Sequence, residues 1–371
     1  MELILWLCLL LVLYSYLLYP LLLLVISGWA SRPEVPSIPE VLPRIAVLIA
    51  AYNEAACIRA RIENLLSLNY PALQIVVGDD GSSDDTASIL KSITSDQLRC
   101  EFSPGNRGKT AVLNDLVAGS DAEVLVFTDA NTKFQDDALV HLVRHLEDST
   151  IGAVCGELQL EGMGSNQDDA YWRYEQFLKK KEAKIGALLG ANGGIYAIRS
   201  ALYETLPDDT INDDFTVVMK IALGGAGVVY DETAIGYETV PPSVQDEYRR
   251  RVRIGAGNYQ AFVRLRNALS PRQGALAFTY ISHKVLRWFT PHLLLVAGCI
   301  LLMLALDSTL YAIICASAVL VCLLSFAAVQ LQRWPILRLL GFWLSMNIAL
   351  MHGFLVFLLG IESGGWKSTE R

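Results

Sequence analysis

The sequence predicts an α/β domain with a doubly wound, mostly parallel sheet, and transmembrane helices on both sides of it in the chain. Four strongly apolar stretches contain no Asp, Glu, Lys or Arg, namely residues 3–26, 291–306, 308–331 and 339–361. Between the first and the second of them, short apolar runs of strand length alternate with segments of helical periodicity. Of the 371 residues, 53% are hydrophobic and only 18% are charged, which is too apolar for an ordinary soluble domain.

The charge balance and the cysteine content exclude several other classes of protein. The formal net charge is −8, whereas a protein whose main partner is nucleic acid carries a basic excess. The seven cysteines include no C-x-x-C pair, so neither a disulfide framework nor a zinc site is indicated. We therefore expect no nucleic acid among the partners of this protein.

The first apolar stretch indicates an N-terminal transmembrane helix within residues 1–30. A secretory signal peptide is the alternative, but Glu2 stands where such a peptide carries a basic residue, and the apolar run is too long for its hydrophobic region. Arg32 and Arg44 follow the helix, and basic residues favour the cytoplasmic side. We therefore expect an integral protein of the plasma or inner membrane with a cytoplasmic catalytic domain.

Three further transmembrane helices are expected within residues 291–361, and a tail of residues 362–371 follows them. The same orientation rule places the acidic turn at Asp307 outside and Arg333 inside. Residues 273–290 are interpreted as a helix lying in the membrane interface. The basic and aromatic side chains that indicate it are His283, Lys284, Arg287 and Trp288. The alternative is a basic flank that only fixes the orientation of the next helix.

A proline-rich linker of residues 31–44 leads to the central domain of residues 45–272. Continuous apolar runs, typical of strands buried on both faces, occur at 45–50, 75–77 and 124–127. Segments of helical periodicity separate these runs, which favours parallel strands joined by helical crossovers.

Each of these three predicted strands ends in polar residues. The three segments are Tyr52-Asn53-Glu54, Asp79-Asp80-Gly81-Ser82 and Thr128-Asp129-Ala130-Asn131. Ligands of doubly wound sheets bind at the carboxyl ends of the strands, so the three segments point to one crevice. No G-x-G-x-x-G follows the first strand and no P-loop motif is present, which argues against a dinucleotide fold and a P-loop enzyme.

The order of short motifs along the chain resembles that of the family 2 glycosyltransferases. The motifs are AAYNE at 50–54, DDGSSDDT at 79–86, NRGKTAVLN at 106–114, TDAN at 128–131, NDD at 212–214 and RRVR at 250–253. More narrowly, the chain resembles the membrane-embedded branch, which includes cellulose, hyaluronan and poly-N-acetylglucosamine synthases. The resemblance covers residues 45–290. It implies a GT-A fold and a nucleotide-diphosphate sugar as donor, with a UDP-sugar expected.

The resemblance also assigns the side chains that bind the nucleotide. They are Tyr52, Glu54, Asp79 and Asp80 for the nucleoside, and Lys109, Arg250 and Arg253 for the diphosphate. Several of these residues keep another interpretation. The arginines at 250–253 could be a basic run beside an anionic membrane surface. Asp80 could cap the helix that follows it, and Lys109 could be a solvated lysine in a loop.

Asp129 and Asn131 match the DxD motif of the family, which implies a site for Mg²⁺ or Mn²⁺. Residues i and i+2 at a strand end point to the same side, so both can face one cation. Asn131 offers an oxygen ligand but removes one negative charge, so more of the coordination is expected from diphosphate and water. An Asx turn is the alternative for this segment.

Asp214 is the general base that the resemblance implies, with Asp213 as its neighbour. Repulsion between two adjacent carboxylates can raise the pKa of one of them towards the range that suits a general base. The alternative is that both are acidic residues in the first turn of the helix predicted over 215–223.

The acceptor side that the resemblance implies includes Asn192, Gly193 and Ile254. Glycines in the segment 190–194 would let the backbone approach a sugar closely. Ile254 stands where the family has Trp, so the aromatic platform on which processive synthases stack the acceptor is missing. Processive polymerisation is therefore in doubt.

These residues predict a metal-dependent, inverting family 2 hexosyltransferase that acts on a glycan or lipid-linked acceptor at the cytosolic membrane face. Two alternatives stay open: a processive polysaccharide synthase that extrudes its polymer, and a catalytically inactive membrane protein that binds nucleotide sugars. A transporter is disfavoured, because four spans with almost no charge form a poor pathway. The expected partners are the donor, the acceptor and the lipid bilayer. The donor sugar, the linkage, the oligomeric state and any partner subunit stay open.

Overall fold

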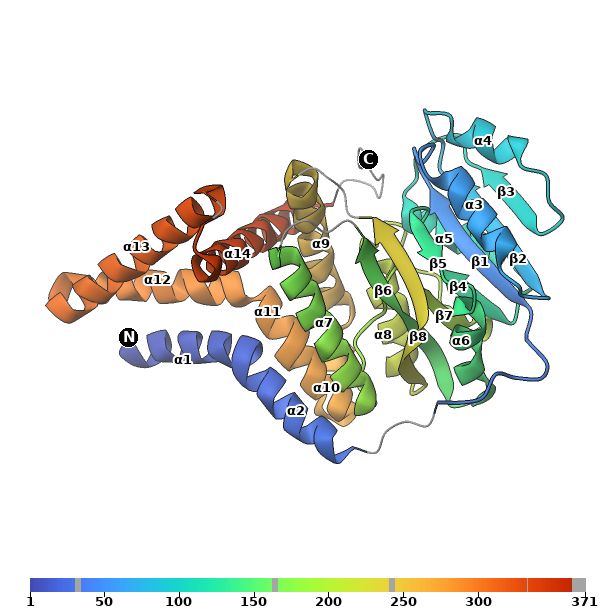
Figure 1. The fold of residues 1–371 in the computed structure, drawn as a ribbon. Coiled ribbons are helices and arrows are strands. Elements are labelled where there is room, and N and C mark those ends of the chain that lie inside the picture. The colour runs from blue at the N-terminus through green and yellow to red at the C-terminus, as the bar shows by residue number, and fades with distance from the viewer. Residues whose placement is uncertain (31–34, 162–165, 240–243, 332, 362–371) are drawn as a thin grey trace.

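The computed structural model describes residues 1–30, 35–161, 166–239, 244–331 and 333–361. An α/β domain lies on one side of the molecule, and long apolar helices from both ends of the chain extend from the other side (Figure 1). The predicted tail of residues 362–371 lies outside the described residues, as do residues 31–34 of the predicted linker.

Eight strands of the described chain form one sheet in the order β3-β2-β1-β4-β7-β6-β8-β5. The pairs β3-β2, β2-β1, β1-β4 and β6-β8 are parallel, whereas β7 is antiparallel to both of its neighbours and β5 is antiparallel to β8. The mostly parallel sheet confirms the predicted fold class. The strands are β1 (Ile45–Ala51), β2 (Leu73–Asp79), β3 (Leu98–Phe102), β4 (Val124–Phe127), β5 (Thr132–Phe134), β6 (Ile151–Glu161), β7 (Tyr196–Arg199) and β8 (Gly227–Thr239).

The three strands predicted from the sequence differ from the observed β1, β2 and β4 by only a few residues. The helices of the α/β domain are α3 (Ile58–Ser67), α4 (Thr86–Ser92), α5 (Lys109–Ala118), α6 (Ala138–Arg144), α7 (Asn166–Lys184), α8 (Asp213–Leu223) and α9 (Val244–Arg264). The short turns are η2 (His145–Glu147), η3 (Ser200–Leu202), η4 (Arg266–Leu269) and η5 (Pro271–Gln273).

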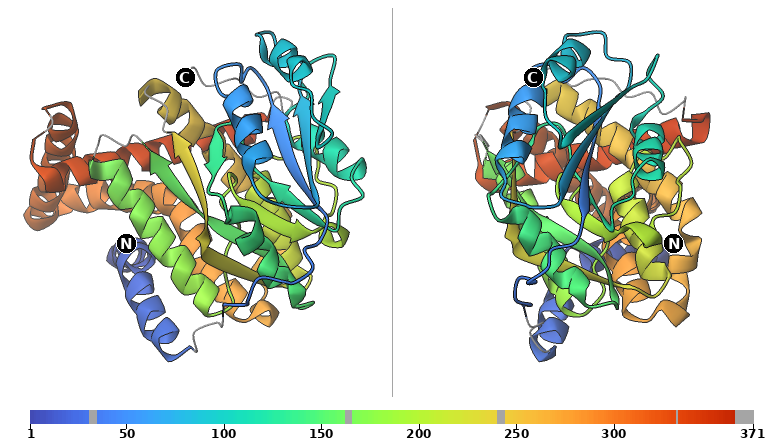
Figure 2. Two further views of the ribbon diagram at one scale, coloured as in Figure 1. Left: turned by 45° about the vertical axis from the view of Figure 1, so that its right-hand side comes forward. Right: turned by 90° about the vertical axis from the view of Figure 1, so that its right-hand side faces the viewer.

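Helices cover both faces of the sheet, and each face has its own apolar core. Successive side chains of β1 point to opposite faces, so Val47 packs in one core with Ile58 of α3 and Leu48 packs in the other with Leu113 of α5. All seven residues of β1 are buried, as its continuous apolar run predicts. The right-hand view of Figure 2 shows the sheet between two groups of helices.

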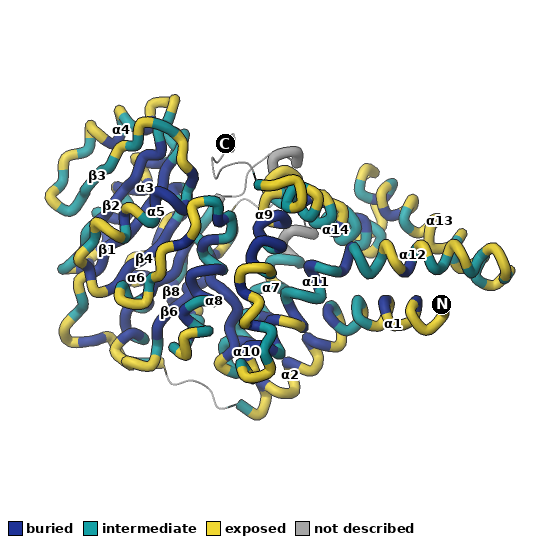
Figure 3. Tube along the Cα trace, turned by 180° about the vertical axis from the view of Figure 1, so that it is seen from behind, coloured by how far each residue is buried: buried dark blue, intermediate teal, exposed yellow. Residues whose placement is uncertain are grey.

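Four helices of the described chain are long and apolar enough to cross a membrane. The first, Glu2–Trp29, consists of α1 (Glu2–Leu13), the π-helical turn η1 (Tyr14–Leu18) and α2 (Tyr19–Trp29). The others are α12 (Thr290–Asp307), α13 (Thr309–Leu331) and α14 (Pro335–Leu359). Many large apolar side chains on these four helices are exposed. Figure 3 colours much of α1, α12 and α13 as exposed. Such a surface fits the hydrocarbon interior of a bilayer.

The last candidate span, α14, packs directly on α9. A Cβ atom added to Gly353 would lie 2.7 Å from the carbonyl oxygen of Val252 and 2.7 Å from the amide nitrogen of Ala256. Small residues at such crossings let two helix backbones approach closely. The helix that carries the predicted diphosphate arginines is therefore fixed against a candidate span.

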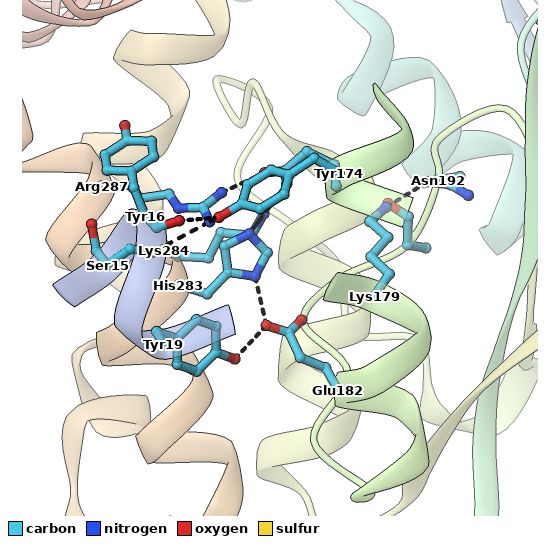
Figure 4. Close-up of polar contacts among 12 residues, drawn as sticks. Ser15, Tyr16, Tyr19, Tyr174, Lys179, Glu182, Asn192, His283, Lys284 and Arg287 are labelled. Carbon is cyan, nitrogen blue, oxygen red and sulfur yellow. Dashed lines mark hydrogen bonds and ion pairs between the residues drawn. The ribbon is translucent and has the colours of Figure 1, made fainter. Parts of the chain in front are cut away.

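The segment predicted to lie in the membrane interface contacts α7 through its basic side chains. It forms α10 (Ala275–Thr279), the π-helical turn η6 (Tyr280–Val285) and α11 (Leu286–Trp288). His283 is fully buried, with Nδ1 2.6 Å from Glu182 Oε1, and Tyr19 donates to the same carboxylate oxygen at 2.7 Å (Figure 4).

The other carboxylate of α7 that meets this segment is Glu175. Arg287 donates to it at 2.5 Å, and Lys284 lies 3.4 Å from it. Burial alone would raise the pKa of Glu175, but Lys284, His283 and Arg287 hold it well below its usual value. The basic residues thus pair with carboxylates inside the protein. The name junction cluster is used below for Tyr19, Glu175, Glu182, His283, Lys284 and Arg287.

Replacing Glu175 by Leu is expected to destabilise the protein strongly. Arg287 and Lys284 would keep buried charges without their partner, which typically costs about 3–5 kcal/mol. The thermal midpoint of the detergent-solubilised protein measures the effect. The control is Glu232→Gln, which breaks only the pair with Lys180 at 3.0 Å, where the glutamate side chain is 61% exposed. Equal midpoints for the two variants would show that the junction cluster contributes little to stability.

Candidate active site

Three strand ends meet at one edge of the sheet. Strands β2, β1 and β4 are parallel neighbours, so the polar segments that follow them emerge side by side. The first two segments are also hydrogen-bonded to each other: the amide of Asn53 donates to Ser82 Oγ at 2.9 Å, and the amide of Glu54 donates to Thr86 Oγ1 at 2.8 Å. The segments that carry the predicted nucleoside residues Tyr52, Glu54 and Asp79 therefore lie together at this edge.

Asp80 holds the loop that leads into α5. It is fully buried, and its carboxylate accepts hydrogen bonds from the amides of Arg107 at 2.9 Å and Gly108 at 2.7 Å. The adjacent Gly81 has a φ of +71°, and a Cβ atom there would lie 2.6 Å from the Cα of Gly105. These contacts tie Asp80 to the 105–108 loop, so it does not cap α4.

Lys109 begins α5 and points into a group of carboxylates. Its Nζ donates to Asp129 Oδ1 at 2.7 Å and lies 3.9 Å from Asp213 Oδ2. Burial disfavours the charged ammonium, but Asp129 and Asp213 outweigh it and raise the pKa of Lys109. Lys109 is therefore a fixed cation between the end of β4 and the start of α8, and the interpretation as a solvated loop lysine does not describe it.

Asp213 and Asp214 begin α8 and differ in their surroundings. Asp213 is 5% exposed, and burial raises its pKa to about 6, with Asp214 and Asp129 adding to the shift and Lys109 opposing it. Asp214 is only half-buried, and its Oδ1 accepts a hydrogen bond from the amide of Phe215 at 2.8 Å. One carboxylate thus lies beneath the site and the other at its surface.

The predicted acceptor residues lie next to Asp214. Asn192 is 4% exposed and donates from its side chain to the carbonyl oxygen of Gly156 at 2.7 Å. A Cβ atom added to Gly193 would lie 3.2 Å from Asp214 Oδ2, so the backbone here borders the carboxylate directly. Residues 190–194, called the acceptor loop below, therefore form one wall beside Asp214.

Helix α9 brings Arg250, Arg253 and Ile254 to the side of the site near Asn212. The side-chain amide of Asn212 donates to the carbonyl oxygen of Ile254 at 3.3 Å, which ties α9 to the residue preceding Asp213. All three α9 side chains are exposed, and Arg250 donates to Glu247 at 2.9 Å.

The oxygen atoms of Asp129 and Asn131 are suitable ligands for Mg²⁺ or Mn²⁺, but they are few. The side-chain nitrogen of Asn131 donates to Glu238 at 3.1 Å, which leaves the amide oxygen as its possible ligand atom. Within the described residues, no group of three or more His, Cys, Asp or Glu side chains is arranged to hold a metal ion. The side chains of Asp129 and Asn131 are therefore suitable for a divalent cation but supply only a few of its ligands. The substrate and water would supply the others.

The sequence did not point to two basic residues that support the site. Arg61 is 3% exposed and donates to Thr128 Oγ1 at 2.8 Å, and Thr128 in turn donates to the carbonyl oxygen of Gly194 at 2.7 Å. Arg61 could have been found from the sequence, because it lies on the apolar face of α3 with Ile58 and Leu65, where a basic residue is unexpected. The second residue, Lys179, belongs to a run of three lysines and gave no such signal.

Comparison with known proteins identifies the domain that carries this site. Residues 46–206 match the family model described as Glycosyl transferase family 2. The poly-beta-1,6-N-acetyl-D-glucosamine synthase of Staphylococcus epidermidis is 27% identical over 230 residues, which cover 59% of this chain and 56% of that protein. The enzyme of the same name from Staphylococcus aureus (strain COL) is 27% identical over 234 residues, with coverages of 60% and 56%. The chain thus matches just over half the length of these curated relatives.

A solved structure shows the same fold over nearly the whole chain. The mannosyltransferase PcManGT from Pyrobaculum calidifontis, in complex with GDP-Man and Mn²⁺, has a TM-score of 0.75 and 23% sequence identity. The likeness covers 97% of this chain and 100% of that one, and it confirms the GT-A fold. Residues 46–206 thus match a glycosyltransferase domain of family 2, within a chain that has the GT-A fold.

Proposed function

We propose that the protein is an inverting, metal-dependent hexosyltransferase of the cytosolic membrane face. It moves a sugar from a nucleotide-diphosphate donor, a UDP-sugar in the first instance, to a glycan or lipid-linked acceptor. The observation that carries this proposal is the meeting of Lys109, Asp129 and Asp213 at the carboxyl edge of the sheet, with Asp214 beside the acceptor loop. A cation for a diphosphate and a carboxylate for an acceptor hydroxyl thus lie next to each other.

The donor side of the site uses the three strand ends. Tyr52, Glu54 and Asp79 are proposed to hold the nucleoside, and Asp80 shapes the loop that delivers Lys109. Lys109 and Arg253 would stabilise negative charge on the leaving diphosphate, with Arg250 as a further cation. The complex of PcManGT with GDP-Man and Mn²⁺ supports a nucleotide sugar and a divalent metal as ligands of this fold. Asp129 and Asn131 would hold that metal, which supplies positive charge to the diphosphate when bound.

The acceptor side of the site needs a base, and Asp214 fits this role better than Asp213. Asp213 is buried and is attracted to Lys109, whereas Asp214 borders Gly193 at the surface of the site. Asp214 would take the proton of the acceptor hydroxyl as its oxygen attacks the anomeric carbon. The attack comes from the face opposite the diphosphate, so the anomeric configuration inverts.

A donor panel tests the proposed function. The purified full chain in detergent is incubated with UDP- and GDP-linked sugars, a divalent metal and candidate acceptors, and both nucleotide diphosphate release and product mass are measured. Release with a matching increase in acceptor mass is expected for at least one donor. Binding of a nucleotide sugar without any release would instead identify an inactive nucleotide-sugar-binding protein.

Products are expected to be short, with one or a few sugars added per encounter, because the aromatic platform is missing. Ile254 is 38% exposed where a stacking ring would stand, and an aliphatic side chain binds a sugar face less well. The buried rings of Tyr259 and Trp288, which are 2% and 5% exposed, are not accessible for such stacking. Product lengths with and without added acceptor measure the effect, and Ile254→Trp should lengthen the products.

The alternative is a processive synthase, which the names of the staphylococcal relatives favour. Long polymer formed from donor and metal alone, with few intermediate lengths, would establish that alternative. Products of equal length from the wild type and Ile254→Trp would show that position 254 does not hold the acceptor.

A further inference from the structure

Lys179 reaches from α7 to the acceptor loop. Its ammonium group donates to the carbonyl oxygen of Ala191 at 3.1 Å and to the side-chain oxygen of Asn192 at 2.5 Å. Figure 4 shows the side chain leaving α7 towards Asn192. Hydrogen bonds from a charged donor are roughly twice as strong as those between neutral groups, so this contact is a strong attachment for the loop.

The loop that Lys179 holds lies against the first turn of α8. Gly190 has a φ of +71°, and a Cβ atom there would lie 2.6 Å from Phe215 Cδ2. Further along the loop, Gly193 borders the carboxylate of Asp214. The position of the loop therefore sets the space in which the Asp214 carboxylate and an approaching hydroxyl must fit.

Lys179 projects from a helix that is itself fixed. Glu182, three residues later on α7, accepts a hydrogen bond from Tyr19 of α2 at 2.7 Å. Tyr174, five residues earlier, donates to the carbonyl oxygen of Tyr16 in η1 at 2.9 Å. These two contacts attach α7 to the first candidate span on both sides of Lys179. A side chain on such a rigid element can hold a loop in one place.

We propose that Lys179 is a positioning residue for the transfer step: it holds the acceptor loop so that the backbone at Gly193 keeps the Asp214 carboxylate aligned with the acceptor hydroxyl. The proposal rests on the proposed function, because Asp214 is the base in that reaction. It assigns no contact between Lys179 and the donor, whose expected binding residues lie at the ends of β1, β2 and β4, at the start of α5 and on α9.

The test replaces Lys179 by Met, which keeps most of the aliphatic stem and removes the donor group. Turnover is expected to fall about 10- to 100-fold, because small misplacements of a catalytic group have effects of this size. The dissociation constant of the donor, measured by calorimetry, should stay within about twofold, and Lys179→Arg should restore most of the turnover, since its guanidinium keeps several donors. Lys179→Gln, which keeps one donor group, serves if the Met variant fails to fold.

The matched control is Lys181→Met on the same helix. The Lys181 ammonium lies over the ring of Phe177, 5.7 Å from its centroid, and the expected turnover of this variant equals that of the wild type. Equal turnover for Lys179→Met and Lys181→Met would overturn the proposal. Parallel losses of donor affinity and turnover in Lys179→Met would also overturn it, because they indicate general disruption of the site.

Hydrogen exchange supplies a readout that does not depend on activity. Mass spectrometry of the full chain in detergent should show faster amide exchange in residues 187–195 for Lys179→Met than for the wild type and Lys181→Met. Unchanged exchange in this segment refutes the role of Lys179. A wild type that releases no nucleotide from any donor refutes the proposed function, whereas the exchange result still decides whether Lys179 holds the loop.

Discussion

Replacing Asp214 by Asn should lower turnover about 10²-fold or more, the usual contribution of a positioned general base. Asn has nearly the same shape as Asp, so the packing against Gly193 is preserved, but its amide cannot take the proton of the acceptor hydroxyl. The affinity for the donor should hardly change, because Asp214 lies on the acceptor side. Turnover and donor affinity, measured separately in the detergent-solubilised protein, distinguish the two effects.

Asp213→Asn is the matched variant for this prediction. Asp213 lies 3.9 Å from Lys109, the proposed diphosphate cation, so its loss should affect donor binding more than the transfer step. If Asp213→Asn loses more turnover than Asp214→Asn, the two roles are exchanged. If neither variant loses turnover, the base lies elsewhere.

Removing divalent metal with a chelator should abolish turnover. Asp129, Asp213 and Asp214 together carry more negative charge than Lys109 neutralises, and a nucleotide diphosphate adds further negative charge to the same place. A bound Mg²⁺ or Mn²⁺ offsets this excess, so its loss should weaken the donor complex as well. Nucleotide release, measured with chelator and after adding back metal, tests the prediction.

Asn131→Asp supplies an internal comparison for the metal. The new carboxylate restores the second acidic ligand, so half-maximal turnover should need a lower metal concentration than in the wild type. Undiminished activity in excess chelator would contradict the assignment of Asp129 and Asn131 as metal ligands. Lys109 and Arg253 would then neutralise the diphosphate alone.

The first half of the sheet was predictable because its strands are buried on both faces. The runs in β1, β2 and β4 are continuously apolar, and this pattern can be recognised in the sequence without knowing which strands lie next to them. The second half was not predicted. Strand β6 contains Glu157 and Gln159, and β8 contains Asp231. The buried carboxylate of Asp231 is paired with Arg144 at 2.7 Å and with His145 at 2.8 Å. Such strands depend on partners distant in sequence.

The same limit applies to the candidate site. The strand-end residues could be placed together because parallel strands align their carboxyl ends. The attachment of Lys109 to Asp129 joins residues 20 positions apart, and His283 meets Glu182 across 101 positions. A run of basic residues before an apolar helix has the same composition whether it faces lipid or a buried carboxylate, so only the fold reveals which.

The contact between Gly353 and α9 holds the candidate active site at a fixed distance from α14. The two helix backbones are in contact there with no side chain between them. The arginines of α9 are therefore held in one position relative to α14. If that helix crosses a bilayer and the proposed acceptor is lipid-linked, the acceptor hydroxyl reaches the site only when the linker between lipid and sugar has a matching length. The helix crossing would then select acceptors by the length of their linker, independently of the sugar that they carry.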